Sequence, residues 1–212
     1  MLAVAGCSKD DVPFDEDYDG PPLELAYTKV TLSADKGELE IEVPAGSESY
    51  SVESGSKSIV SASVSGNKIK LKAEKTGSAK VTVTDKKSGD KKTIGVEVIS
   101  KEDFHSAILA SWYWMSEKII YSTDGGKTFS NTKDRLFMRV QDEEKRMGKV
   151  TDGVPDTYKY NLVGNKITYP DLKDANTIIY YVKKDEVLHL VDIFDNGSFI
   201  QKIEFIMDDG IG

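Results

Sequence analysis

Between residues 23 and 100, apolar and polar residues alternate in short runs separated by glycine-containing turns. Strict alternation indicates strands with one buried face, and turns roughly every 8 to 12 residues are typical of a β-sandwich. The pattern predicts seven strands, at residues 25–32, 39–43, 50–54, 59–64, 68–73, 79–84 and 94–99. We therefore expect an all-β protein whose first half is a seven-stranded sandwich.

The later strands of this sandwich follow a more specific pattern. One strand ends in a tight turn, a second runs to a glycine, and a third reads Ala-x-Val-Thr-Val. The residues are Ala62, Val64, Gly66, Asn67, Ile69, Ala73, Gly77, Ala79, Val81, Thr82 and Val83. This segment resembles bacterial Ig-like domains of group 2, which are built as seven-stranded sandwiches. The resemblance implies a spacer or adhesion module, so we expect residues 23–100 to act as a stalk.

Residues 101–212 are predicted to begin with a short helix and to continue as strands. Ser100 and Asp103 have the spacing of a capping box, and Phe104 and Ile108 lie one helical turn apart. The alternation predicts eight strands, at residues 111–122, 134–142, 146–150, 157–163, 166–169, 177–182, 186–193 and 198–207. Tight hairpin turns join them, and an antiparallel meander of this kind loses its free edges by closing into a barrel.

The order of a helix, a tryptophan-bearing first strand and a meander resembles the small lipocalin-like domains of secreted bacterial lipoproteins. The residues that carry the resemblance are Leu109, Ser111, Trp112, the segment 158–169 with its Gly164-Asn165 turn, and the strand 188–190. Ala110 stands where the family usually has a glycine. An eight-stranded barrel is either filled by side chains or wide enough for one small ligand.

Aromatic residues are concentrated after residue 100, at alternating positions of the predicted strands. Two interpretations stay open: these side chains fill the barrel, or some of them line a cup for a small apolar ligand or a glycan. The candidate ligand-binding aromatic residues are Trp112, Trp114, Tyr158, Tyr160, Tyr180, Phe199 and Phe205. Arg135 and Arg139 flank Phe137 and either clamp an anionic group or lie on a solvated exterior.

The segment from Ser122 to Phe129, with Asp124, Gly125 and Gly126 at its centre, resembles an Asp-box. In that motif the aspartate caps a hairpin turn through backbone hydrogen bonds, and the final aromatic residue packs beneath it. The propellers that use this motif contain several copies, whereas this chain has one. We therefore expect a single ordered hairpin.

The first residues indicate where the protein lies in the cell. Val4, Ala5 and Gly6 before Cys7 resemble a lipobox, in which the cysteine receives a lipid that anchors the protein to a membrane. Lys9, Asp10 and Asp11 resemble the signal that sends lipoproteins of certain Gram-negative bacteria to the outer face of the outer membrane. The resemblance implies a membrane partner through Cys7 and an exterior location. Residues 1–22 are expected to be this lipobox remnant followed by an acidic, disordered tether.

The tether also contains part of a calcium-binding pattern. Asp15, Asp17, Asp19 and Gly20 match the first half of an EF-hand loop, but its twelfth position is Ala26 rather than a glutamate. The sequence therefore predicts no metal site and no cofactor.

An enzymatic role and nucleic-acid binding have little support. His105 and His189 lie in no catalytic motif, and no cysteine besides Cys7 is present, so we expect no catalytic residues. The net charge is −8, without the basic stripe that nucleic acids require. Three hypotheses result: a surface protein for adhesion or protein interaction, a binder of a small apolar ligand or glycan, and an enzyme with an unrecognised site. We favour the first, with an Ig-like stalk (23–100) that presents a lipocalin-like head (101–212) to an unknown surface partner.

Overall fold

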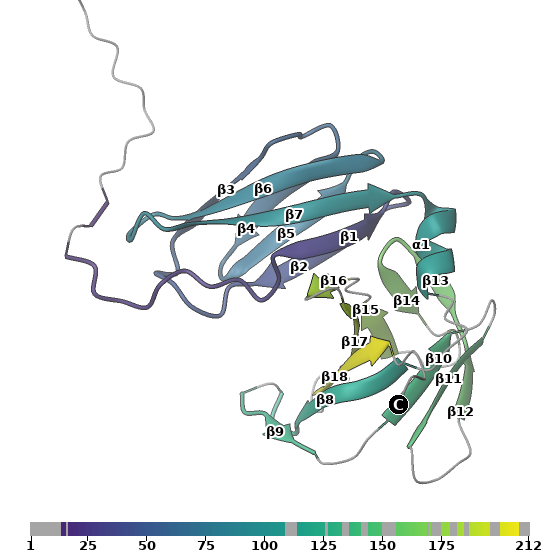
Figure 1. Cartoon of the computed structure of the whole chain (residues 1–212). Coiled ribbons are helices and arrows are strands. Elements are labelled where there is room, and N and C mark those ends of the chain that lie inside the picture. The colour runs from purple at the N-terminus through teal and green to yellow at the C-terminus, as the bar shows by residue number, and fades with distance from the viewer. Residues whose placement is uncertain are drawn as a thin grey trace, which may run out of the picture.

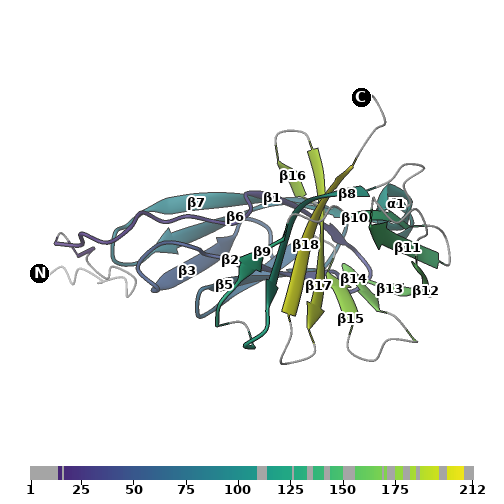
Figure 2. The ribbon, with the colours of Figure 1, turned by 90° about the horizontal axis from the view of Figure 1, so that it is seen from below.

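The computed structural model is mostly β, with several sheets and one short helix (Figures 1 and 2). It describes residues 14–15, 17–108, 114–125, 127–132, 136–140, 144–149, 156–168, 170, 175–178, 182–184, 187–195 and 200–207. Strands β10, β11, β15, β16 and β17, and parts of β8, β12 and β18, are described by their backbone alone.

Residues 23–99, which we call the N-terminal body, contain seven strands in two sheets. The strands are β1 (Lys29–Ser33), β2 (Glu38–Glu42), β3 (Tyr50–Ser54), β4 (Val60–Ser65), β5 (Lys68–Ala73), β6 (Gly77–Asp85) and β7 (Lys91–Ile99). One sheet has the order β1-β7-β6-β3 and the other β2-β5-β4. The pair β1 and β7 is parallel, and the other pairs are antiparallel. Six of the seven predicted strands are therefore confirmed with small shifts at their ends, and the first is confirmed only from Lys29 onward.

The two sheets enclose one hydrophobic core. Leu32, Ile41, Ile69, Leu71 and Ile94 are fully buried and come from both sheets. Each contributes about 1.5 to 3 kcal/mol through burial of its side chain. Every second residue of these strands points into this core, which is why the period-2 pattern located the strands correctly.

The predicted first strand is divided in the structure, because the chain changes sheets within it. Before β1, the backbone N–H of Glu24 donates to the carbonyl of Ala45 (2.9 Å) and that of Ala26 to Glu42 (3.0 Å). After Thr28 the chain pairs with β7 instead. The alternation of apolar and polar residues does not reveal where the chain moves from one sheet to the other, because its apolar residues face the same core on both sides of that point.

Of the segment before residue 23, which was predicted to be a disordered tether, the structure describes residues 14–15 and 17–22. From residue 14 this segment runs along the end of the N-terminal body that carries the β6–β7 turn (Figure 1). The N–H of Asp15 donates to the carbonyl of Lys87 (3.0 Å), and the Phe14 ring lies against Gly89. These contacts give the segment a defined path onto the sandwich.

A buried carboxylate organises the turn that this segment meets. Asp85 is fully buried and accepts hydrogen bonds from the Ser47 N–H (2.7 Å), the Ser47 hydroxyl, and the N–H groups of Lys87 (3.0 Å) and Ser88 (3.2 Å). Burial acts to raise the pKa of Asp85, but these hydrogen bonds outweigh it and hold the pKa below its usual value. The ionised form of Asp85 therefore joins two loops.

Helix α1 (Lys101–Ile108) follows β7 as predicted. The Ser100 hydroxyl accepts from the Asp103 N–H (3.0 Å) and donates to its carboxylate (2.7 Å), which confirms the cap. Phe104 is fully buried beneath the helix.

We call residues 114–207 the C-terminal body; its described residues form one sheet of eleven strands. They are β8 (Trp114–Ser122), β9 (Ser130–Asn131), β10 (Leu136–Val140), β11 (Glu144–Lys149), β12 (Asp156–Lys159), β13 (Asn161–Val163), β14 (Lys166–Thr168), β15 (Ala175–Ile178), β16 (Val182–Lys184), β17 (Val187–Asp195) and β18 (Ile200–Met207). The main order is β12-β11-β10-β8-β18-β17-β15-β14-β13, with β9 on β8 and β16 on β17. Most pairs join strands that are neighbours in sequence, so the predicted antiparallel arrangement is present, but with eleven strands instead of the predicted eight.

The closed barrel that the sequence predicted is not present in the described part of the chain. Among the described residues no strand pair links β12 to β13, the two ends of the sheet order, so the sheet is not closed into a barrel. Both segments fall in the single strand predicted at 157–163, which is interrupted at Tyr160. β12 pairs with β11 on one side of this interruption, and β13 pairs with β14 on the other. The chain itself, rather than a ladder of hydrogen bonds, connects the two ends of the sheet.

Candidate functional site

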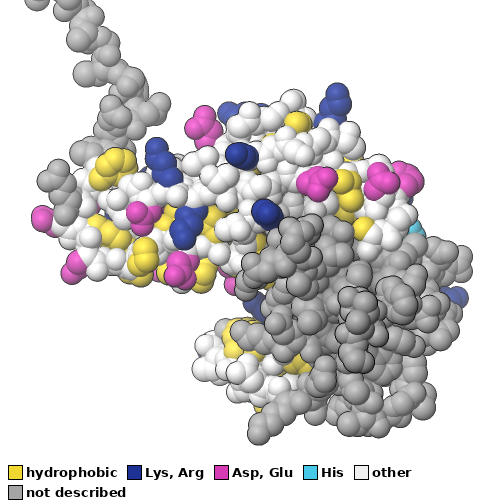
Figure 3. Space-filling view, viewed as in Figure 1, with side chains coloured by type: hydrophobic (Ala, Val, Ile, Leu, Met, Phe, Trp, Pro, Cys, Tyr) yellow, Lys and Arg dark blue, Asp and Glu magenta, His cyan; other side chains and the backbone are white. Residues whose placement is uncertain are grey.

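A groove of about 1090 Å³ lies between the outer face of the β2-β5-β4 sheet and the C-terminal body. Its described lining comes from both bodies and consists mostly of charged and polar residues, whose aliphatic parts and a few apolar side chains add apolar surface. Figure 3 shows that acidic and basic side chains are interspersed over the visible surface of the N-terminal body, with hydrophobic side chains between them.

The wall on the N-terminal body is a ladder of opposite charges. In β2, Glu38, Glu40 and Glu42 alternate with residues of the core, and in β5 Lys68, Lys70 and Lys72 do the same. The antiparallel register places Glu38 opposite Lys72, Glu40 opposite Lys70 and Glu42 opposite Lys68. Since the apolar residues between them face the core, the outer face of β2 and β5 carries only these charges, and opposite charges in cross-strand pairs stabilise the sheet.

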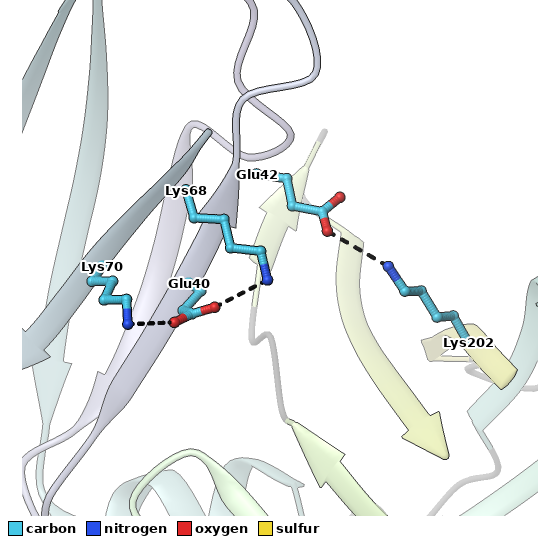
Figure 4. Close-up of polar contacts among 5 residues, drawn as sticks. All are labelled: Glu40, Glu42, Lys68, Lys70 and Lys202. Atoms are coloured by element: carbon cyan, nitrogen blue, oxygen red, sulfur yellow. Dashed lines mark hydrogen bonds and ion pairs between the residues drawn. The ribbon is translucent and has the colours of Figure 1, made fainter. Parts of the chain in front are cut away.

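Glu40 lies at the centre of this ladder (Figure 4). Its carboxylate oxygens contact Lys70 Nζ at 3.0 Å and Lys68 Nζ at 3.2 Å. The hydrogen bond from Lys70 is the main cause that holds the pKa of Glu40 below its usual value, and Lys68 adds to it. One carboxylate is thus shared by two ammonium groups.

On the opposite wall, the hairpin between β8 and β9 contributes Phe129. Asp124 organises this hairpin: its carboxylate accepts from the N–H groups of Lys127 and Thr128 (both 3.0 Å) and from the hydroxyls of Ser122 and Thr128 (both 2.7 Å). These hydrogen bonds hold the pKa of Asp124 far below its usual value, and the bond from the Ser122 hydroxyl has the largest effect. The predicted single hairpin is confirmed, but Phe129 is 42% exposed at the groove rather than packed beneath the turn.

Lys202 of β18 reaches across the groove. Its Nζ lies 3.5 Å from Glu42 Oε1 in β2 (Figure 4). The same Nζ lies 5.4 Å from the centre of the Phe129 ring. The cation therefore contacts one acidic group on the first wall and one aromatic face on the second.

Asn165 fixes the position of the two bodies at one end of the groove. Its Oδ1 accepts from the Ser33 N–H, and its Nδ2 donates to the Thr31 carbonyl, both at 2.9 Å. These backbone groups lie at the free edge of β1, whose other edge pairs with β7. The Asn165 amide thus supplies to this sheet edge the donor and the acceptor that a neighbouring strand would supply, and β16 of the C-terminal body also lies close to β1. Asn165 is 2% exposed, so these bonds are shielded from water.

Two glycines permit this close approach. Gly164 has a φ of 59°, and a Cβ at this position would overlap the carbonyl of Lys36. A Cβ on Gly37 would overlap the Ser33 carbonyl and lie 2.8 Å from Asn165 Oδ1. The turn Gly164-Asn165 therefore packs backbone against backbone on the turn that follows β1. An ion pair between Lys101 and Asp35 (3.6 Å) adds a contact between α1 and the same turn.

The predicted ligand-binding residues are only partly placed. Cys7, Trp112, Arg135, Tyr180 and Phe199 lie outside the described residues, and Trp114, Arg139, Tyr158 and Phe205 are described by their backbone alone. The sheet order brings the strands of Arg139, Trp114 and Phe205 side by side, as β10-β8-β18. The aromatic cup therefore stays a prediction.

Tyr160 is the one predicted site residue with a described side chain. It is 9% exposed, and its hydroxyl is hydrogen-bonded to His105 Nε2 at 3.0 Å. The two residues line a second hollow of about 540 Å³ beside α1. Tyr160 thus ties the helix to the C-terminal body at the point where the chain passes from β12 to β13.

The described residues contain no group of three or more His, Cys, Asp or Glu side chains arranged to hold a metal ion. In the segment that resembles half of an EF-hand loop, Asp15, Asp17 and Asp19 are all exposed. No described helix is both long enough and apolar enough to cross a membrane.

Sequence comparison gives no further guide to this site, since the chain matches neither a protein-family model nor a curated protein. The charged wall itself has a signal in the sequence. The runs Glu-Leu-Glu-Ile-Glu and Lys-Ile-Lys-Leu-Lys place three like charges on the outer face of each of two strands. The sequence prediction relied on aromatic clusters, which do not reveal this wall.

Proposed function

We propose that this chain is a non-enzymatic, lipid-anchored protein of the bacterial outer surface, in which an Ig-like stalk and a lipocalin-like head together bind an external partner. The groove between the two bodies is the observation that carries this proposal. Its walls come from both bodies, and Asn165 bonds them together through buried contacts. A groove of this construction offers a binding surface that neither body has alone.

The lipid anchor rests on the resemblance of residues 4–7 to a lipobox, with Cys7 as the modified residue. The contact of Asp15 with the β6–β7 turn supports the assignment of the N-terminal body as a stalk. The chain enters the N-terminal body at that end, and it leaves at the other end, where β7 leads into α1 (Figure 1). The nine residues of β7 span about 30 Å. A chain anchored at Cys7 would therefore hold the end of the N-terminal body that joins α1 away from the membrane.

The arrangement of four and three strands around one core supports the Ig-like assignment. The lipocalin-like assignment is supported by the meander, by the pairing of its first long strand β8 with its last strand β18, and by the direct connection from β12 to β13. The sheet order therefore starts and ends at segments that are adjacent in the chain.

The anchor is tested by Cys7→Ser in a Gram-negative host. The unaltered protein is expected in the outer-membrane fraction and to be cleaved by protease added to intact cells, whereas the Cys7→Ser protein is expected in the soluble fraction. Membrane retention of the Cys7→Ser protein would contradict the lipid anchor.

The groove is tested by adhesion of cells that display the protein to surfaces coated with mucin, gelatin or albumin. Ser63→Tyr adds a ring to the groove wall, because Ser63 is exposed in β4 and lines the groove. Ser51→Tyr is the matched control, since Ser51 is exposed in β3, in the other sheet. Adhesion to mucin or gelatin above the albumin background should be lost in Ser63→Tyr alone. Equal adhesion of the two variants, or none by the unaltered protein, would contradict the proposal.

A further inference from the structure

We propose that the groove binds an acidic saccharide, a sugar chain that bears carboxylate or sulfate groups. This inference rests on the proposed function, because it takes the groove as the binding surface. It adds the chemical class of the ligand, which follows from the charge, the hydrogen-bonding groups and the apolar surface of the two walls.

The charge of the groove is opposite to that of the whole chain. The chain has 28 basic and 36 acidic residues and a net charge of −8. The described lining of the groove has six lysines and three glutamates, a net charge of +3: Lys36, Lys68, Lys70, Lys72, Lys166 and Lys202, with Glu38, Glu40 and Glu42. A positive groove on an acidic protein attracts anions and concentrates them at one place.

Three of the six lysines are available for a ligand. Glu40 pairs with Lys68 and Lys70, and Glu42 pairs with Lys202. Lys36, Lys72 and Lys166 form no ion pair with any described residue, and all three are exposed. They come from the β1–β2 turn, β5 and β14, so the unpaired ammonium groups lie on both walls. An anionic chain in the groove would contact both bodies.

The uncharged groups of the walls suit a sugar. Ser63 of β4 lines the groove and lies opposite Lys70 of β5, and Thr168 of β14 lines the other wall beside Lys166. Hydroxyls beside lysines offer both donors and acceptors to sugar hydroxyls. Phe129 and Val163, which are 42% and 49% exposed, provide apolar surface for the C–H face of a sugar ring.

The same geometry disfavours an acidic peptide. A peptide that adds to a sheet is held by main-chain hydrogen bonds at a free strand edge. The groove covers the face of the β2-β5-β4 sheet, where β5 pairs on both sides and only side chains are presented. Recognition here depends on side-chain contacts with charged and hydroxyl groups, which a saccharide carries on every unit.

The test measures binding of the full chain with Cys7→Ser to immobilised dextran sulfate, polygalacturonate, uncharged dextran and polyglutamate. We expect binding to at least one of the two acidic polysaccharides, none to dextran, and weaker binding to polyglutamate. Replacing the three unpaired lysines, in Lys36→Gln/Lys72→Gln/Lys166→Gln, should weaken acidic-polysaccharide binding about tenfold or more.

Lys57→Gln/Lys75→Gln/Lys91→Gln is the matched control, because it removes the same charge from exposed lysines outside the groove. This control should bind within about twofold of the unaltered chain if the groove is the site. Equal losses in the two triple variants, tighter binding to polyglutamate, or no binding to either acidic polysaccharide would overturn the inference. If one of these results were obtained but Ser63→Tyr still abolished adhesion, the proposed function would be retained, and only the assignment of an acidic saccharide as the ligand would be wrong.

Discussion

The two bodies build their sheets by different routes. In the N-terminal body, only β4 with β5 and β6 with β7 are pairs of consecutive strands, while β1 with β7, β2 with β5 and β3 with β6 join distant segments. In the C-terminal body most pairs are consecutive, and the pairing of β8 with β18 is the principal long-range one. The first body is thus held by one shared core, and the second by a chain of local hairpins.

Because each body is built from its own strand pairs, the contact at Asn165 matters for the position of one body relative to the other. Each body pairs its strands within itself, so their relative position depends on the contacts where they meet, which include those of β16 and α1 with β1. Asn165 and the glycine turns beside it supply buried contacts for this purpose, whereas Lys202 supplies an exposed one. Substitutions within each body and at their junction test this comparison.

The largest effect is expected from a cavity in either core. Ile69→Ala in β5 and Ile203→Ala in β18 each remove a buried side chain, and each should cost about 2 to 5 kcal/mol of unfolding free energy. If the two bodies unfold separately, calorimetry should show that each variant lowers the melting temperature of its own body more. An equal shift of both transitions would mean that the bodies unfold as one unit.

Asp85→Asn is expected to lower the free energy of unfolding by about 3 kcal/mol at neutral pH. The buried N–H groups of Ser47 and Lys87 donate to the two carboxylate oxygens of Asp85, and an asparagine replaces one of these oxygens with an NH₂ group that cannot accept. Since the folded pKa of Asp85 is lowered, its contribution is present above the unfolded pKa of about 4 and is lost as the pH falls through the folded pKa. Urea unfolding between pH 7 and pH 2 should show a smaller loss of stability on acidification in Asp85→Asn. An unchanged pH profile would contradict this role.

Asn165→Ala should cost about 2 kcal/mol, because the Ser33 N–H and the Thr31 carbonyl lose buried partners. Asn161→Ala is the control, since Asn161 is exposed on the neighbouring strand β13. Hydrogen exchange should show faster exchange of the Ser33 amide in Asn165→Ala only. Unchanged protection of Ser33 would show that another group covers this edge.

The smallest effect is expected for the ion pair across the groove. A double-mutant cycle of Lys202→Gln and Glu42→Gln should give a coupling of about 0.5 kcal/mol, since both side chains are partly exposed. The coupling should decrease in high salt. A coupling above about 2 kcal/mol would mean that Lys202, rather than Asn165, holds the walls together.

Much of the fold could be predicted from local patterns. Alternation located the seven strands of the N-terminal body, and the spacing of Ser100 and Asp103 located the start of α1. The hairpin around Asp124 was also predicted, because its hydrogen bonds join residues at most four positions apart. In each case the physical cause lies within a few residues of the signal.

The candidate site could not be predicted in the same way. The turn at Gly164-Asn165 was expected, but the partners of Asn165 are backbone atoms 132 and 134 residues away, and any residue type offers those atoms. The interruption at Tyr160 is equally non-local, because its hydroxyl bonds to His105 on α1. The alternation of charged with apolar residues in β2 and β5 can be read from the sequence. That these charges lie in a groove depends on where the second body docks.

The most direct test of a fixed groove is a comparison of the alignment tensors of the two bodies, measured from backbone residual dipolar couplings of the full chain. We predict one common tensor for residues 23–99 and for the strands of the C-terminal body, and two different tensors after Asn165→Ala. Two different tensors in the unaltered protein would contradict the claim that Asn165 fixes the walls of the groove.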